Sequence, residues 1–184
     1  GARPAIPHRA GRGLVSVAGT GKPCDGLAAT LAAARPEDLA RIAAFQHVHP
    51  MMAAALRRDA TLAAALPRDL GLYFEAMHAA NAERSASGRD QLSQLAGVLR
   101  RADLEVLVLK GGGDLLDPLH GDPALRFVSD LDILVRADRG PAVQALLGRL
   151  GGAWQEFNSY TATIMHHFPP VTRPDWDFPV EIHV

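Results

Sequence analysis

The sequence has few of the residues that disulfide-stabilised, metal-cluster or membrane proteins depend on. Cys24 is the only cysteine among 184 residues, which excludes an internal disulfide and a cysteine-ligated metal cluster. Aromatic residues make up 5%, and no apolar run approaches the roughly 20 residues that a membrane span needs. The first residues include scattered arginines but no apolar segment of the signal-peptide type, so a cytoplasmic location is the default expectation.

An excess of charge of either sign is also lacking. The formal net charge is −1, whereas a nucleic-acid binder usually has a basic face, so a nucleic acid is a disfavoured partner. Hydrophobic residues make up 48% and charged residues 21%, as in an ordinary soluble globular protein. The length suits one domain, or a small domain beside a helical one.

The N-terminal half favours helices. Residues 1–26 are rich in Gly, Pro and Arg without sustained periodicity, which predicts a flexible extension. Residues 27–102 predict a helical domain, because apolar side chains repeat there at helical spacing. The expected helices cover 36–50, 51–66, 68–84 and 90–102, with a break at Ser85-Ala86-Ser87-Gly88.

The C-terminal half changes to β patterns. Short apolar runs predict strands within 104–109, 131–135, 154–158 and 178–184, and the periodicity of 139–150 predicts a helix that ends at Gly151-Gly152. Residues 103–184 are therefore expected to form a small α/β core. The fold class predicted for the whole chain is α+β, with a helical N-terminal region packed on a small mixed sheet.

Asp130 lies directly before an apolar β run, and Asp132 lies within that run. In a strand, residues i and i+2 point to the same face, roughly 6–7 Å apart. Two carboxylates on one face repel each other unless a cation lies between them, and oxygen ligands suit Mg²⁺. The pair alone is a weak signal, since surface acids at a strand end are the plain alternative.

Two further features strengthen this interpretation. Gly111 and Gly112 follow a strand-like run, where they let the backbone approach a phosphate. Glu181 is a third acid within an apolar alternation and could lie on the same face of a neighbouring strand. Three carboxylates from two strands beside a glycine turn make a two-metal phosphoryl-transfer site plausible.

The order of these motifs resembles that of a family of uncharacterised bacterial nucleotidyltransferases in the DNA polymerase beta-like superfamily. The resemblance covers about residues 100–184 and rests on four pieces: Val106–Gly112 with its Leu-Lys-Gly turn, Arg126, Ser129–Val135 with Asp-x-Asp, and Val180–His183 with Glu-x-His. Each piece alone is unspecific, and their combined order and spacing is fairly specific. Members of the family continue with more helix, whereas this sequence stops three residues after Glu181, so we expect it to be partial at the C-terminus.

The resemblance implies a role for each matching residue. Asp130, Asp132 and Glu181 would be the catalytic, metal-binding carboxylates, with Glu181 helping to activate the attacking hydroxyl. The nucleoside triphosphate would be held by the glycine turn, Gly111 and Gly112. Two positively charged side chains, Lys110 and Arg126, would face it as well.

The function expected from these residues is a metal-dependent nucleotidyltransferase that uses two Mg²⁺ ions and an NTP. It would move a nucleoside monophosphate to an acceptor hydroxyl and release pyrophosphate. Neither the NTP nor the acceptor (a small molecule, peptide or protein) is readable from the sequence, and no membrane partner is expected. The alternative is a catalytically inactive protein of the same fold that binds a nucleotide or a protein.

The histidines leave other possibilities open. His166, His167 and His183 could be combined with the acids into a zinc site, but no His-Glu-x-x-His spacing occurs. Solvated or packed histidines are the favoured interpretation. His183 shares a strand face with Glu181, so it is either a neighbour that supports the ligands or a core or edge histidine.

Overall fold

The structure is a computed structural model that describes residues 26–154 and 168–184. These residues form two compact units, which are described separately. The helical unit comprises residues 26–83 and 124–127, and the sheet unit comprises residues 84–123, 128–154 and 168–184. The predicted extension up to residue 25 and the His166-His167 pair lie outside the described residues. The predicted domain ranges, 27–102 and 103–184, stay a prediction.

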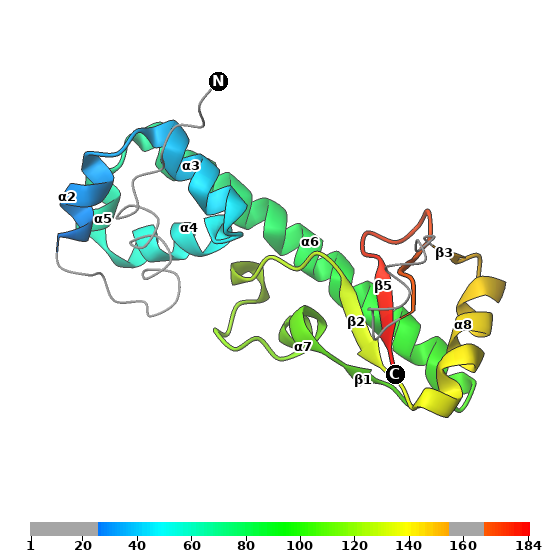
Figure 1. The fold of residues 1–184 in the computed structure, drawn as a ribbon. Helices are drawn as coiled ribbons and strands as arrows, with labels where there is room; N and C mark the ends of the chain where they lie inside the picture. The colour runs from blue at the N-terminus through cyan, green and yellow to red at the C-terminus, as the bar shows by residue number, and fades with distance from the viewer. Residues whose placement is uncertain (1–25, 155–167) are drawn as a thin grey trace, which may run out of the picture. The chain divides into compact units, whose positions relative to one another are not determined.

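The helical unit is built from short helices and the first part of a long one. Its elements are α2 (Leu27–Ala32), α3 (Pro36–Phe45), α4 (His49–Arg58), α5 (Ala60–Ala65) and the start of α6 (Arg68–Arg101) (Figure 1). Pro36 occupies the first turn of α3, where its missing N–H costs no hydrogen bond. The apolar stripes of these helices meet in one core, whose fully buried members include Leu31, Leu39, Met52 and Phe74.

The single helix predicted over 51–66 is wrong, because two helices cover this stretch. The chain is extended at Asp59, whose carboxylate accepts hydrogen bonds from the backbone N–H groups of Thr61 (2.9 Å) and Leu62 (3.1 Å). An aspartate cap satisfies backbone donors at a helix start, so it favours a new helix over continuation of the old one.

The break predicted at residues 85–88 is also wrong, since α6 runs without interruption from Arg68 to Arg101. The small residues serve packing within the sheet unit instead. A Cβ on Gly88 would lie 2.9 Å from Leu115 Cδ1 and 3.1 Å from the ring of Phe178. The hydroxyl of Ser85 donates to the carbonyl of Pro123 at 3.2 Å. Tertiary contacts therefore outweigh the helix-breaking tendency of this sequence.

The sheet unit contains one mixed, five-stranded sheet. Its strands are β1 (Leu107–Val108), β2 (Leu131–Leu134), β3 (Ala153–Trp154), β4 (Val171–Thr172) and β5 (Val180–His183), in the order β1-β2-β5-β4-β3. Among the described strands, β2 and β5 lie side by side and pair in parallel (Figure 1), and the other pairings are antiparallel. The remaining elements are α7 (Lys110–Leu116), η1 (Pro123–Leu125), η2 (Ala137–Arg139) and α8 (Gly140–Arg149).

The two central strands are held in place by their apolar side chains. Leu131 and Ile133 of β2 and Val180 and Ile182 of β5 are completely buried. They form one core with three leucines on the last turns of α6, Leu92, Leu95 and Leu99. A shift of one residue in register would turn this apolar set to the opposite face, so the core fixes which polar residues lie side by side.

The predicted fold class is confirmed, because helices accompany a small mixed sheet. The helix predicted over 139–150 corresponds to α8, and Gly151 follows it with φ of 87°, as in a glycine helix stop. The strand predicted within 104–109 is shorter than expected, because β1 covers two residues of it. The strand predicted over 154–158 lies outside the described residues except at Trp154. Within residues 26–154 and 168–184, no helix combines the length and apolar character needed to cross a membrane.

Candidate active site

Asp132 and Glu181 lie opposite each other on the two parallel central strands. The register pairs Asp132 with Glu181 and Leu134 with His183. Directly paired residues on neighbouring strands project to the same face of the sheet. The structure therefore brings two of the three predicted carboxylates together on the face opposite the buried isoleucines.

Asp132 is the buried member of this pair. Its side chain is 2% exposed, whereas that of Glu181 is 20% exposed. An ionised carboxylate is costly to bury without compensating charge or hydrogen bonds. Two nitrogen groups provide this compensation, one from Lys110 and one from His183.

Lys110 reaches Asp132 from the start of α7. The backbone N–H of Leu109 donates to the carbonyl of Asp132 at 2.9 Å, which anchors the preceding residue beside β2. The Lys110 Nζ then lies 2.5 Å from Asp132 Oδ1. Lys110 has a φ of +47°, in the left-handed region that non-glycine residues seldom adopt. Such strain, held by surrounding structure, is typical of functional sites.

The acids hold Lys110 firmly in its charged form. The hydrogen bond to Asp132 raises the pKa of Lys110 above its ordinary value, and partial burial opposes this effect. The charges of Asp132, Glu181 and Asp130 raise this pKa further. All three predicted carboxylates therefore lie within electrostatic range of one ammonium group, which is 56% exposed and can turn towards an anionic ligand.

His183 makes the second contact to Asp132. Its Nε2 lies 2.6 Å from Asp132 Oδ1 and 4.0 Å from Glu181 Oε2. The sequence interpretation left His183 as either a support for the ligands or a core or edge histidine. The contact places its ring nitrogen among the carboxylates, and its alternation with Glu181 in β5 was the signal for this arrangement.

Asp130 precedes β2 and is partly exposed. Its Oδ1 accepts a hydrogen bond from the hydroxyl of Ser129 at 2.7 Å. The group of potential metal ligands that converges among the described residues consists of Asp132, Glu181 and His183, with donor atoms within 4.8 Å of one another. The predicted metal-binding role of Asp130 therefore stays a prediction.

Gly111 and Gly112 are buried in the first turn of α7. A Cβ on Gly111 would lie 3.0 Å from both methyl carbons of Val128, and a Cβ on Gly112 would lie 2.7 Å from Val108 Cγ1. The glycines therefore let α7 pack closely against its neighbours, a role that the sequence interpretation missed. Their predicted contact with a triphosphate stays a prediction.

Arg126 is exposed and belongs to the helical unit, whereas the converging acids belong to the sheet unit. Its predicted role at the triphosphate stays a prediction as well.

The donor set suits a divalent cation. Asp132 and Glu181 supply carboxylate oxygens, which are the ligands that Mg²⁺ and Mn²⁺ prefer. The ammonium of Lys110 already lies against Asp132, which shows that this position favours positive charge. The residues therefore fit a divalent metal ion.

Comparison of the sequence with known protein families identifies the family of this chain. Residues 32–184 match the family described as an uncharacterised nucleotidyltransferase. The chain belongs to this nucleotidyltransferase family. The predicted family is thereby confirmed, and nucleotide transfer is the general kind of reaction that membership supports. No curated protein matches the chain.

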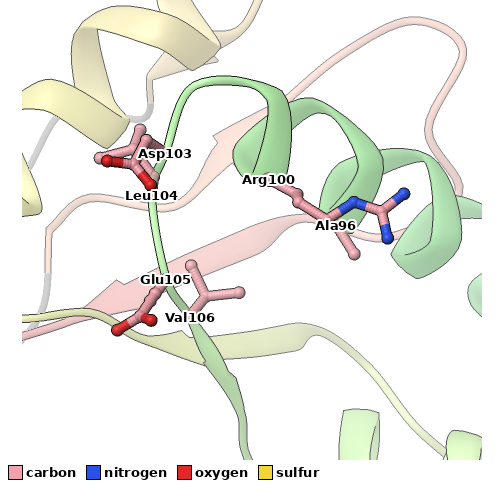
Figure 2. Close-up of a pocket in the computed structure, with 6 residues that line it drawn as sticks. All are labelled: Ala96, Arg100, Asp103, Leu104, Glu105 and Val106. Atoms are coloured by element: carbon pink, nitrogen blue, oxygen red, sulfur yellow. The ribbon is translucent and has the colours of Figure 1, made fainter.

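The chain also has an open hollow of about 610 Å³ at the end of α6. It is lined by Ala96 and Arg100 of the helix and by the segment Asp103–Val106 that leads to β1 (Figure 2). None of the predicted site residues lines it, and it has comparable polar and apolar character. The hollow therefore adds nothing to the assignment of the active site.

Proposed function

We propose that this chain is a metal-dependent nucleotidyltransferase that moves a nucleoside monophosphate from an NTP to an acceptor hydroxyl. The observation that carries the proposal is the register of β2 and β5, which places Asp132 beside Glu181 on one face of the sheet. Family membership supports the same kind of reaction. Asp130, at the entrance to β2, completes the proposed set of carboxylates.

The proposed reaction forms one bond and breaks one bond. The acceptor oxygen forms a bond to the α-phosphorus, the bond between the α-phosphorus and the bridging oxygen breaks, and pyrophosphate leaves. Divalent cations held by Asp130, Asp132 and Glu181, Mg²⁺ in the first instance, would supply the charge that acidifies the acceptor hydroxyl and stabilises the leaving group. The hydroxyl proton passes to solvent or to the Glu181 carboxylate, which is partly exposed at the site.

The cationic residues act on the triphosphate. Lys110 leaves Asp132 and turns towards the phosphate oxygens, which its half-exposed side chain permits. Its charge then offsets negative charge that develops in the transition state. We assign Arg126 the same type of contact, and we assign Gly111 and Gly112 the close approach of backbone to phosphate.

The identity of the acceptor is left to experiment. The near-neutral net charge favours a small molecule, a peptide or a protein over a nucleic acid. ATP labelled at the α-phosphorus and ATP labelled at the γ-phosphorus should be incubated with the protein, Mg²⁺ and pools of candidate acceptors. Label should transfer from the α position alone, with stoichiometric pyrophosphate.

The variant Asp132→Asn tests the site. Loss of a metal-binding carboxylate removes several kcal/mol of transition-state stabilisation, so transfer should fall by about a hundredfold or more. Asp138→Asn is a matched control, because Asp138 is an exposed aspartate of the same unit that pairs with Arg136. Asp138→Asn should retain activity. Transfer that survives in a folded Asp132→Asn variant contradicts the proposal, and Mg²⁺-independent nucleotide binding without turnover supports the inactive binding protein instead.

A further inference from the structure

The imidazole of His183 faces both carboxylates of the candidate metal site. Its Nε2 lies 2.6 Å from Asp132 Oδ1 and 4.0 Å from Glu181 Oε2. The side chain is 18% exposed, so it is held largely within the protein and not displayed on the surface. One nitrogen and two oxygen donors therefore point into the same small space.

The spacing of these donor atoms is close to that in the coordination sphere of a divalent ion. Ligands about 2.1 Å from a six-coordinate ion lie about 3 Å apart when adjacent and about 4.2 Å apart when opposite. The His183 nitrogen is 2.6 Å and 4.0 Å from its two carboxylate neighbours, and all three donor atoms lie within 4.8 Å of one another. The 2.6 Å contact is shorter than the spacing of adjacent ligands, so His183 and Asp132 would move slightly apart to share one ion.

The register of β2 and β5 fixes the face of the sheet on which these three side chains lie. Glu181 and His183 alternate along β5, and Asp132 is paired with Glu181 on β2. Because Val180 and Ile182 are completely buried on the other face, β5 cannot turn His183 away without exposing its core residues. His183 is thus held on the same face of the sheet as the two carboxylates.

We propose that His183 is a direct metal ligand, completing with Asp132 and Glu181 a one-nitrogen, two-carboxylate site that binds Mn²⁺ in preference to Mg²⁺. An imidazole nitrogen suits transition metals, whereas Mg²⁺ is bound almost entirely by oxygen. The two carboxylates keep the site suitable for Mn²⁺. This inference deepens the proposed function, on which it rests, by naming the ion of one metal position and an additional ligand.

The competing role for His183 is a hydrogen bond to Asp132 with no bond to the ion. A ring N–H that donates to the carboxylate would orient Asp132 and leave the metal with oxygen ligands only. The two roles differ in a single observable, which is whether nitrogen lies in the first coordination sphere of the bound ion.

Electron spin-echo envelope modulation of bound Mn²⁺ measures this observable directly. The wild-type protein with substoichiometric Mn²⁺ should show ¹⁴N modulation from a coordinated imidazole. The modulation should disappear in His183→Gln and persist in His120→Gln, where an exposed histidine of the same unit is replaced. Absence of ¹⁴N modulation in the wild type, or modulation that persists in His183→Gln, overturns the proposal.

Calorimetric titrations with each metal alone give the second readout. Loss of a supporting hydrogen bond can lower metal affinity by 10–100-fold, so loss of a direct ligand should lower Mn²⁺ affinity by at least about tenfold. Mg²⁺ affinity should change much less, so His183→Gln should reduce the preference for Mn²⁺. An equal loss for both ions overturns the proposed selectivity. Circular dichroism and thermal melts confirm that the variants are folded.

These experiments distinguish failure of the metal-ligand proposal from failure of the proposed function. If nucleotide transfer is present but Mn²⁺ shows no nitrogen ligand, the proposed function stands and this inference fails. If nitrogen-ligated Mn²⁺ is found but no nucleotide is transferred under any condition, the metal ligand stands and the proposed function fails.

Discussion

At the scale of single residues, Lys110 connects the metal site and the proposed triphosphate site. It pairs with the buried Asp132 while half of its side chain remains exposed. A half-exposed lysine that pairs with an acid can leave that acid for another anion with little change in the burial of its side chain. Its strained backbone, with φ of +47°, fixes the point from which the side chain extends.

Amine-selective chemical modification provides a direct test of Lys110. The sequence contains two lysines, Lys22 and Lys110, so mass spectrometry can follow each one separately. ATP with a divalent cation should slow the modification of Lys110 several-fold, because the ammonium becomes engaged by phosphate. Modification of Lys22 serves as the internal reference. Equal rates for Lys110 with and without nucleotide would contradict its proposed contact with the triphosphate.

His49 gives the helical unit a predictable response to acid. Burial lowers the pKa of His49 below its ordinary value of 6.5, although a hydrogen bond with the Ala43 carbonyl opposes this shift and the charge of His47 adds to it. The ring also lies against Phe127, with centroids 5.9 Å apart. The folded protein therefore favours neutral His49, whereas the unfolded chain protonates it more readily.

The sign of the pH effect follows from this difference. A depressed folded pKa contributes stability that is present above pH 6.5 and is lost as pH falls through the folded pKa. Urea unfolding at a series of pH values should show a decrease below pH 6.5 that is smaller in His49→Gln. The partly exposed His78 of the same unit offers the control variant His78→Gln, which should keep the decrease. An identical pH profile in His49→Gln and the wild type would be incompatible with this account.

At the scale of secondary-structure elements, α6 shows where a sequence pattern and tertiary packing disagree. Residues 85–88 combine small and helix-disfavouring side chains, which predicted a break. The same small side chains allow Leu115 and Phe178 to approach the helix. A glycine within a helix costs about 1 kcal/mol relative to alanine. Burial of apolar side chains against the helix contributes more free energy than this.

Substitutions at two glycines of α6 distinguish the effect of helix propensity from the effect of close packing. Gly97→Ala should stabilise the protein by up to about 1 kcal/mol, because alanine favours the helix and the nearest neighbour of the new Cβ is Arg101 at 3.5 Å. Gly88→Ala should be less stable than Gly97→Ala by about 1–3 kcal/mol, because overpacking against buried neighbours offsets the gain in propensity. Urea unfolding followed by circular dichroism measures both. Equal stabilisation by the two substitutions would show that Gly88 is not a packing position.

The elements that could be predicted from sequence are those with a strong local signal. The helix start at Pro36, the helix that became α8 and the apolar strand after Asp130 each carry a cap, a period or a stop signal. The cap at Asp59 was missed because the surrounding alanines continue a helical pattern. β4 was missed because two residues provide no periodicity.

At the scale of the whole molecule, the candidate site could be predicted in part because the motif order specifies the family. The sequence identified Asp132 and Glu181, and the parallel pairing of β2 with β5 brought them together. The contacts of His183 and Lys110 with Asp132 could not be predicted, because they depend on strand register and on the backbone angle at Lys110. The sequence supplies the residue types, and the fold determines which of them converge.

The family match covers both units of the described chain, since it spans residues 32–184. The helical residues are therefore a regular part of proteins of this family. The proposed site, however, lies in the sheet unit, where a pair of parallel strands holds the acids and one short helix supplies the lysine.

The central claim is that the facing carboxylates of Asp132 and Glu181 bind the divalent cation that accompanies the nucleotide. A crystal structure with Mn²⁺ and a non-hydrolysable NTP analogue, recorded with anomalous data, tests this claim most directly. The account predicts an anomalous peak bonded to both carboxylates and to the triphosphate, with Lys110 turned away from Asp132. A cation and nucleotide bound elsewhere on the protein, with the pair of Lys110 and Asp132 intact, would contradict it.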